Sequence, residues 1–141
     1  MASFERLRSN LYGANLFSGQ IDLNPTHGLS GFFIVQHSSD AGFAGKQLLP
    51  LILAGCSSFH FIGEYRAVWN GEFLKQQHQL FLGNTEEPQF LSVSYDSLDS
   101  FAAALQGEMS IKPIVPHDIY LLYDDEALYQ DVLHQLNDWR P

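Results

Sequence analysis

Residues 28–65 constrain the fold more than any other stretch of the chain, because they carry the pattern of a strand, a helix and a second strand. Residues 31–36 form a short apolar run without strict alternation, which is typical of a strand buried on both faces of a parallel sheet. Residues 41–54 have the leucine-rich content of a helix, and residues 58–62 form a second apolar run. This short spacing predicts a right-handed parallel crossover.

The predicted helix has recognisable ends and one residue that disfavours it. Asp40 is a candidate N-cap, and Gly55 stands where a left-handed C-terminal cap is expected. Pro50 lies inside the pattern, where it removes one backbone hydrogen bond and costs roughly 3 kcal/mol unless the helix bends or restarts. We therefore expect a kinked helix or two helical pieces.

Helix and strand patterns continue to alternate after this unit. The predicted elements are, in order, a helix over 64–78, a strand over 90–95, a helix over 98–109, a strand over 119–123 and a last helix that is opened by Asp124 and Asp125 and buries Leu128, Val132, Leu136 and Trp139. Before the unit, apolar residues on one helical stripe predict an N-terminal helix over 4–11. A hairpin about Ser18 and Gly19, or an irregular arm, is expected over 16–23, and a turn over 24–28.

Four strands that alternate with four helices predict one α/β domain of three layers over residues 1–141, with residues 1–27 as a helix and arm packed on it. The sheet is expected to be mostly parallel, with four or five strands and helices on both faces. The simplest strand order is 2-1-3-4, counted from the strand at 31–36, and ligands bind at the carboxyl ends of strands where such an order reverses. The strand residues predicted to be largely buried are Phe32, Ile34, Val35, Phe59, Phe61, Leu91, Val93, Ile119 and Leu121.

The charge of the chain limits the class of binding partner, and its cysteine content indicates the cellular compartment. The chain has 7 basic and 16 acidic residues, for a net charge of −9, which opposes nucleic-acid binding and favours a basic partner. The charge is also explained as an aid to solubility alone, and the general argument favours that explanation. The single cysteine, Cys56, cannot form an internal disulfide, and neither an export signal nor an apolar run of about 18 residues is present. We expect a soluble cytoplasmic protein without membrane contact.

Acidic residues follow each predicted strand, so the predicted fold gathers them at one edge of the sheet. Three interpretations are open: these residues cap helix N-termini, they form a surface for a basic partner, or they hold Mg²⁺ through carboxylate oxygens. As a partner surface, the binding residues would be Asp40, Glu64, Asp96, Asp99, Asp124 and Asp125.

Other chemistry has weaker support in the sequence. Neighbouring His37 and Ser38 do not make a triad, and no G-x-S-x-G motif presents a nucleophile. The turn HSSDAGFAG lacks the glycine spacing of a phosphate-binding loop. His60 alternates with phenylalanines in a strand, so we expect it to be packed or hydrogen-bonded. No zinc-ligand spacing occurs among His27, His37, His60, His78, His117 and His134.

These observations predict a non-enzymatic acidic binding protein with no catalytic residues, no cofactor and no metal. Its most concrete form is a bacterial immunity protein that neutralises a basic toxin by direct binding. The alternative is a Mg²⁺-dependent enzyme or regulatory domain that binds a small phosphorylated ligand at the acidic strand ends. A subunit of a larger complex is a third possibility.

Overall fold

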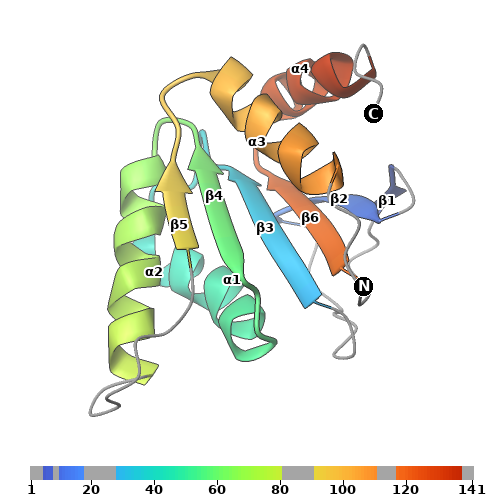
Figure 1. The fold of residues 1–141 in the computed structure, drawn as a ribbon. Coiled ribbons are helices and arrows are strands. Elements are labelled where there is room, and N and C mark those ends of the chain that lie inside the picture. Colours follow the sequence, from blue (N-terminus) through green and yellow to red (C-terminus); the bar gives the residue numbers. More distant parts are fainter. Residues whose placement is uncertain (1–4, 8–9, 18–27, 81–90, 111–116, 138–141) are drawn as a thin grey trace.

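The computed structural model describes residues 5–7, 10–17, 28–80, 91–110 and 117–137 (Figure 1). Within these ranges one sheet has the strand order β1-β2-β6-β3-β4-β5. The strands are β1 (Glu5–Arg6), β2 (Leu11–Asn15), β3 (Gly28–Ile34), β4 (Ser58–Ile62), β5 (Leu91–Ser94) and β6 (His117–Tyr123). The helices are α1 (Ala41–Leu53), α2 (Arg66–Leu80), α3 (Leu98–Ser110) and α4 (Glu126–Asn137). Strands β2 to β6 are parallel to one another, and the two-residue β1 is antiparallel to β2.

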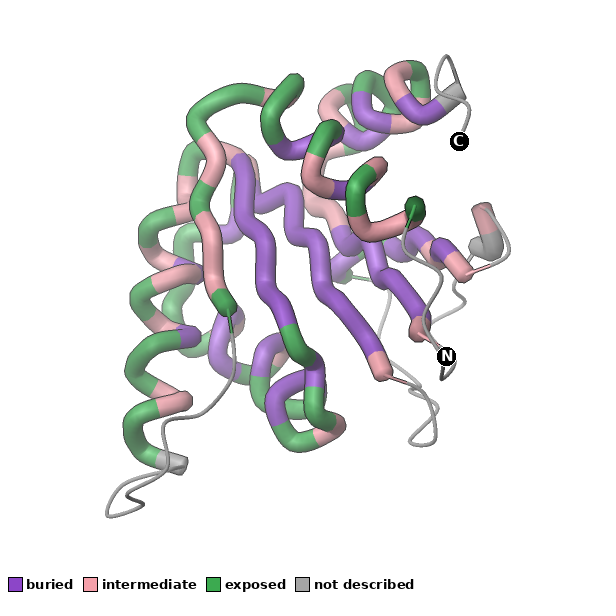
Figure 2. Tube along the Cα trace, in the orientation of Figure 1, coloured by how far each residue is buried: buried purple, intermediate pink, exposed green. Residues whose placement is uncertain are grey.

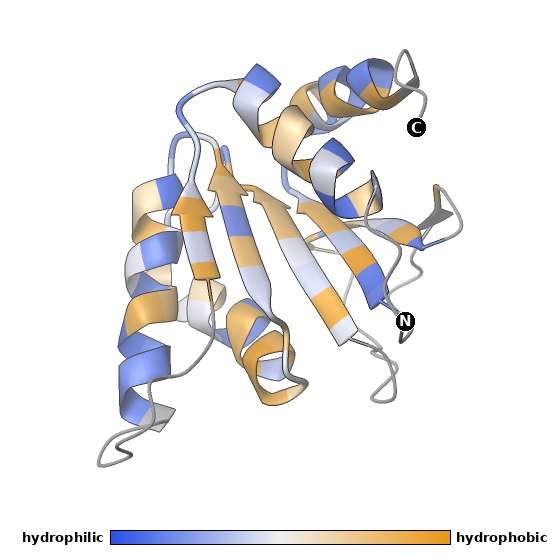
Figure 3. Cartoon of the chain, in the orientation of Figure 1, coloured by the Kyte–Doolittle hydropathy of each residue, from blue (hydrophilic) through white to orange (hydrophobic). Residues whose placement is uncertain are grey.

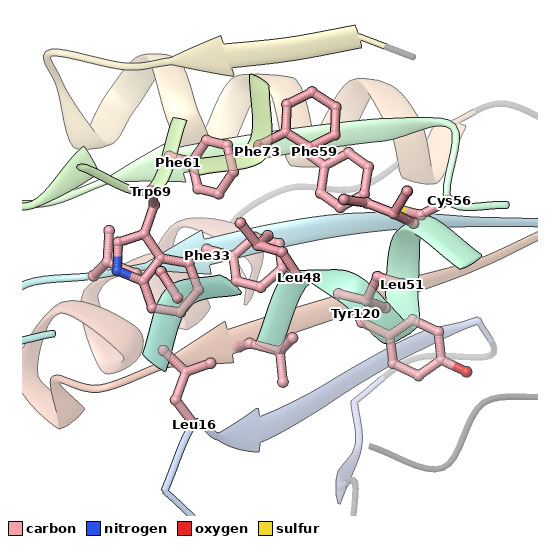
Figure 4. Close-up of a cluster of buried hydrophobic side chains, with 14 of the residues drawn as sticks. Leu16, Phe33, Leu48, Leu51, Cys56, Phe59, Phe61, Trp69, Phe73 and Tyr120 are labelled. Carbon is pink, nitrogen blue, oxygen red and sulfur yellow. The ribbon is translucent and has the colours of Figure 1, made fainter. Parts of the chain in front are cut away.

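The sheet is the middle layer of an α/β fold of three layers, as predicted. Helices α1 and α2 pack on one face, where Phe33, Phe61 and Trp69 have ring centroids 5.3–6.5 Å apart (Figure 4). Helices α3 and α4 pack on the other face, where Phe101 meets the ring of Phe32 edge-on. The central strands are buried along most of their length (Figure 2), and apolar residues concentrate there and on α1 (Figure 3).

The crossover from β3 through α1 to β4 is confirmed, and α1 is one continuous helix, so the expectation of two helical pieces is wrong. The Asp40 carboxylate accepts hydrogen bonds from the backbone N–H groups of Gly42 and Phe43, and α1 then continues through Pro50 to its end at Leu53. Pro50 lies in the last turn of this helix, and its carbonyl oxygen accepts from the backbone N–H of Ala54 at 3.0 Å. Gly55 follows with a φ of 85°, which is the predicted left-handed cap.

The strand order differs from the prediction. Strand β5 pairs with β4, and β6 pairs with β3, so the four predicted strands stand in the order 4-1-2-3, with β2 beyond β6. The chain steps from β3 to β4 to β5 through α1 and α2 on one face, and then crosses the other face through α3 to the far side of β3. The reversal therefore lies between β3 and β6.

Two further expectations are corrected. The predicted N-terminal helix over 4–11 is wrong for its described residues, because 5–6 and 11–15 form strands. Pairing with β6 decides this, since Leu11 and Ala14 are buried against the sheet. Leu91 is 56% exposed because β5 is an edge strand, and Val93 is half-buried. The other strand residues predicted to be buried are buried. The expected hairpin at 18–19, the turn over 24–27 and Trp139 lie outside the described residues.

None of the described helices has the length and apolar character that a membrane crossing needs.

Candidate functional site

The carboxyl ends of the parallel strands meet at one edge of the sheet, at the upper end in Figure 1. The chain leaves β3 at residues 35–40, β4 at 63–65, β5 at 95–97 and β6 at 124–125. All six predicted acidic residues therefore lie at or next to this edge. Their hydrogen bonds divide them into two groups with different duties.

Asp124 is held by four hydrogen bonds from the segment that follows β3. Its Oδ1 accepts from the backbone N–H of Gln36 at 2.7 Å. Its Oδ2 accepts from the N–H of His37 at 2.9 Å, and from the N–H and hydroxyl of Ser38 at 2.8 and 2.6 Å. Three successive N–H groups that converge on one carboxylate form an anion-binding nest. Asp124 is thus a structural residue that fixes the start of the β3–α1 connection.

This nest lies between β3 and β6, where the winding of the sheet reverses. Strands β3 and β6 are neighbours, but the chain leaves β3 for α1 on one face and leaves β6 for α4 on the other. Ligands of open α/β sheets commonly bind in the crevice at such a reversal. Here the N–H groups that would receive a ligand's anionic group already bind the carboxylate of Asp124.

Asp125 and Asp40 are also engaged in local structure. Asp125 caps α4 by accepting from the backbone N–H of Leu128 at 2.9 Å, and its other oxygen lies 2.8 Å from Nε2 of His37. The Leu128 N–H, and after it the His37 ring, hold the pKa of Asp125 below its ordinary value. Asp40 caps α1 at 2.8 Å from the Gly42 N–H. The capping interpretation therefore accounts for both carboxylates.

Glu64, Asp96 and Asp99 form the second group, which we call the exposed acidic end. The side chain of Asp96 is 94% exposed and lies 3.0 Å from Arg66. Asp99 accepts a hydrogen bond from Gln135 at 3.0 Å. Glu64 is exposed, and its carboxylate has no partner among the described residues.

None of these three carboxylates caps a helix. The N-cap of α3 is Ser97, whose hydroxyl accepts from the backbone N–H of Ser100 at 3.1 Å. Asp96 pairs with Arg66 at the surface, and solvent-exposed ion pairs contribute little to stability. The exposed acidic end is therefore available for contacts that the fold itself does not require.

Charge is distributed unevenly between two parts of the chain. Residues 28–80 carry three acidic and three basic side chains, whereas residues 81–141 carry eleven acidic side chains and two basic ones, Lys112 and Arg140. Eight of the eleven lie in described residues, namely Asp96, Asp99, Glu108, Asp118, Asp124, Asp125, Glu126 and Asp131. Helices α3 and α4 themselves carry Asp99, Glu108, Glu126 and Asp131 without any Lys or Arg, while α1 and α2 carry Lys46, Arg66 and Lys75 against Glu72.

A buried polar chain that the sequence did not reveal runs across the α3 side of β4. The Ser58 hydroxyl donates to Glu108 at 3.3 Å, so its oxygen accepts from Nε2 of His60 at 3.1 Å, and the Tyr95 hydroxyl donates to Nδ1 at 2.7 Å. His60 is 5% exposed and stacks on Phe32, with ring centroids 4.0 Å apart. Burial lowers the pKa of His60 to about 4, which keeps the ring neutral. The expectation of a packed, hydrogen-bonded histidine is confirmed.

The described part of the chain offers neither a reactive thiol nor a metal site. Cys56 is fully buried, and burial raises the pKa of its thiol, which donates to the backbone oxygen of Ser58 at 3.2 Å. A thiol of this kind is inert. The described residues contain no group of three or more His, Cys, Asp or Glu side chains arranged to hold a metal ion.

The residues missed at the sequence level are those that Asp124 and Asp125 bind. The tandem Asp124-Asp125 after a strand, and the polar run His37-Ser38-Ser39-Asp40 after another, mark the two segments. Nothing in the sequence pairs them across 86–88 positions, because the pairing depends on β3 lying beside β6. Comparison with protein-family profiles, with curated proteins and with solved structures gave no match to this chain.

Proposed function

We propose that this chain is a non-enzymatic binding protein whose exposed acidic end receives a basic protein partner. The concrete form is a bacterial immunity protein that neutralises a cationic toxin. The proposal rests above all on the division of the acidic residues. Asp40, Asp124 and Asp125 serve the fold, whereas Glu64, Asp96 and Asp99 are exposed carboxylates without a capping duty.

The uneven distribution of charge supports the same proposal. Asp96 and Asp99 belong to the part of the chain, residues 81–141, that carries eleven acidic and two basic side chains. A field of one sign on one side orients a cationic partner before contact and raises its association rate. Charge that served solubility alone would not need to be gathered in this way.

The filled nest at the β3–β6 reversal argues against the alternative of a Mg²⁺-dependent domain with a phosphorylated ligand. A phosphate at that position would have to displace the carboxylate of Asp124 from four hydrogen bonds. We expect MgCl₂ and inorganic phosphate, together or singly, to leave the melting temperature unchanged. A rise that saturates with concentration would favour the alternative, because a ligand that binds only the folded state stabilises it.

The direct test uses the product of the gene beside the one that encodes this chain, since an immunity protein is encoded next to its toxin. That product should stop growth when it is expressed alone, and co-expression of this chain should restore growth. A triple variant, Glu64→Lys with Asp96→Lys and Asp99→Lys, should fold but fail to protect, whereas Glu72→Lys on α2 should still protect. A neighbouring product that is harmless, or that does not bind this chain, would contradict the proposal.

A further inference from the structure

Strand β5 ends the sheet, and its outer edge is open in the described part of the chain. The backbone N–H groups of Leu91 and Tyr95 donate to β4, at 3.2 Å to Ser57 and 2.9 Å to Phe61. The N–H and C=O groups of one residue in a parallel ladder point to the same side, and the side alternates along the strand. Ser92 and Ser94 therefore direct their N–H and C=O groups away from β4, toward solvent.

Among the features that usually prevent an edge strand from pairing with another chain, the described residues of β5 have one, a length of only four residues. Natural edge strands are protected by charged side chains, proline or a bulge. Strand β5 reads Leu-Ser-Val-Ser, without charge or proline, and its register with β4 is continuous from Leu91 to Ser94. Leu91 is 56% exposed beside this edge. An extended segment can thus add a strand here, with main-chain hydrogen bonds to Ser92 and Ser94.

The charges around the edge of β5 determine which kind of extended segment is attracted to it. Asp96, with a side chain that is 94% exposed, lies two residues after Ser94, the last strand residue, and pairs with Arg66 at 3.0 Å. Glu108 lies near the first strand residue, because its carboxylate accepts from Ser58, which is the register partner of Leu91. A second copy of this chain would bring a net charge of −9 against −9. A segment with Lys or Arg residues is attracted instead.

We propose that the basic partner adds an extended, cationic segment to the open edge of β5 as a further strand. This inference rests on the proposed function and specifies how the partner binds. The bound strand lies between the carboxylates of Asp96 and Glu108, so its basic side chains meet negative charge at both ends of β5. The exposed acidic end, which includes Asp96, provides attraction before contact, and the β5 edge provides the main-chain hydrogen bonds.

The test removes one backbone N–H group that points away from β4 and keeps the hydrogen bonds between β5 and β4. Ser94→Pro removes an outward donor and places a ring at the edge, and Val93 before it already has the extended backbone that proline requires. Ser94→Ala is the matched control, because it removes the hydroxyl and keeps the N–H. With the neighbouring toxin as the probe, Ser94→Pro should raise the Kd at least about tenfold, and Ser94→Ala should leave it unchanged. Both variants should keep the melting temperature within a few degrees.

Each other outcome has a defined meaning. If Ser94→Pro binds as tightly as the parent while the triple lysine variant does not bind, strand addition is wrong and the proposed function stands. If the toxin fails to bind the parent chain, both proposals fall. If sedimentation finds a dimer that Ser94→Pro dissociates, the edge binds a second copy, and the inference is overturned. If Ser94→Pro unfolds, hydrogen exchange of the parent chain replaces it. The amides of Ser92 and Ser94 should exchange more slowly in the complex with the toxin than in the free chain, and unchanged exchange would refute strand addition.

Discussion

Asp124 and Asp99 are both aspartates at the carboxyl edge of the sheet, yet they differ in how many hydrogen bonds the fold gives them. Asp124 is partly buried and receives three backbone N–H groups and a hydroxyl. Asp99 is exposed and receives one amide hydrogen bond, from Gln135. At the scale of the residue, the number of hydrogen bonds that a carboxylate satisfies within the fold decides whether it is free to bind a partner.

Asp124→Ala should therefore destabilise the fold strongly. Removing the carboxylate leaves three N–H groups of the β3–α1 connection without their acceptor, and we expect a loss of roughly 2–4 kcal/mol in the free energy of unfolding. Asp99→Asn should change it by less than about 1 kcal/mol, because only a helix-dipole contribution is reduced. Urea unfolding of the two variants and the parent measures both values. Equal stabilities would show that the nest does not hold the connection in place.

His60 should make stability depend on pH in a mildly acidic range. Its pKa is 6.5 in the unfolded chain and about 4 in the fold, because burial disfavours the charged ring. Between these values the unfolded chain binds more protons, so this contribution is complete above pH 6.5 and is lost as pH falls toward 4. The shift corresponds to about 3 kcal/mol.

Urea unfolding of the parent and of His60→Gln between pH 7.5 and 4.5 tests this assignment. The free energy of unfolding should decline more steeply with falling pH in the parent than in the variant. Parallel pH profiles would contradict a buried neutral His60.

At the scale of the element, Gly63 fixes the exit from β4. Its φ is 117°, and an added Cβ would lie 2.7 Å from the backbone C and O of Val35. Gly71 lies inside α2, where a Cβ meets nothing within 4 Å. We expect Gly63→Ala to lower the melting temperature through a strain of roughly 1–3 kcal/mol, and Gly71→Ala to raise it through about 1 kcal/mol of helix propensity. Thermal unfolding decides the signs, and a neutral Gly63→Ala would refute the close approach of the two strand ends.

The elements differ in how well the sequence predicts them, for identifiable reasons. Strands β3 and β4 and helix α1 follow from local apolar patterns and local caps. The residues of each element are therefore sufficient to predict it. In the N-terminal region, Leu7 and Leu11 fit a helical stripe as well as a strand, and pairing of β2 with the distant β6 decides between them. Strand order is likewise a matter of non-local pairing, and nothing in the apolar run of β6 indicates that its neighbour is β3.

The same limit applies to the candidate site. The sequence placed the acidic residues at one edge, because parallel strands end on the same side. It indicated that Asp99 has no capping duty, because Asp96 or Ser97 can cap that helix. It could not show how Asp124 is held, since the hydrogen bonds of Asp124 come from Gln36, His37 and Ser38, about 87 positions away. The chain of Tyr95, His60 and Ser58 is hidden for the same reason.

At the scale of the whole molecule, the chain combines a balanced half with an acidic half. Residues 28–80 carry three acidic and three basic side chains, and residues 81–141 carry eleven acidic and two basic ones. This arrangement predicts that a cationic partner approaches from the side of β5, α3 and α4. The attraction acts over a distance comparable to the Debye length, about 10 Å at 0.1 M salt, so salt should weaken it.

The most direct test of this account is the rate of association with the proposed toxin, the product of the neighbouring gene, measured by stopped flow at low and high salt. Asp99→Asn removes one charge from the exposed acidic end, and Glu72→Gln removes one charge from α2 as the matched control. We predict that Asp99→Asn slows association at low salt, that the difference shrinks at high salt, and that Glu72→Gln associates like the parent. Identical rates for Asp99→Asn and the parent at low salt would contradict a docking role for the exposed acidic end.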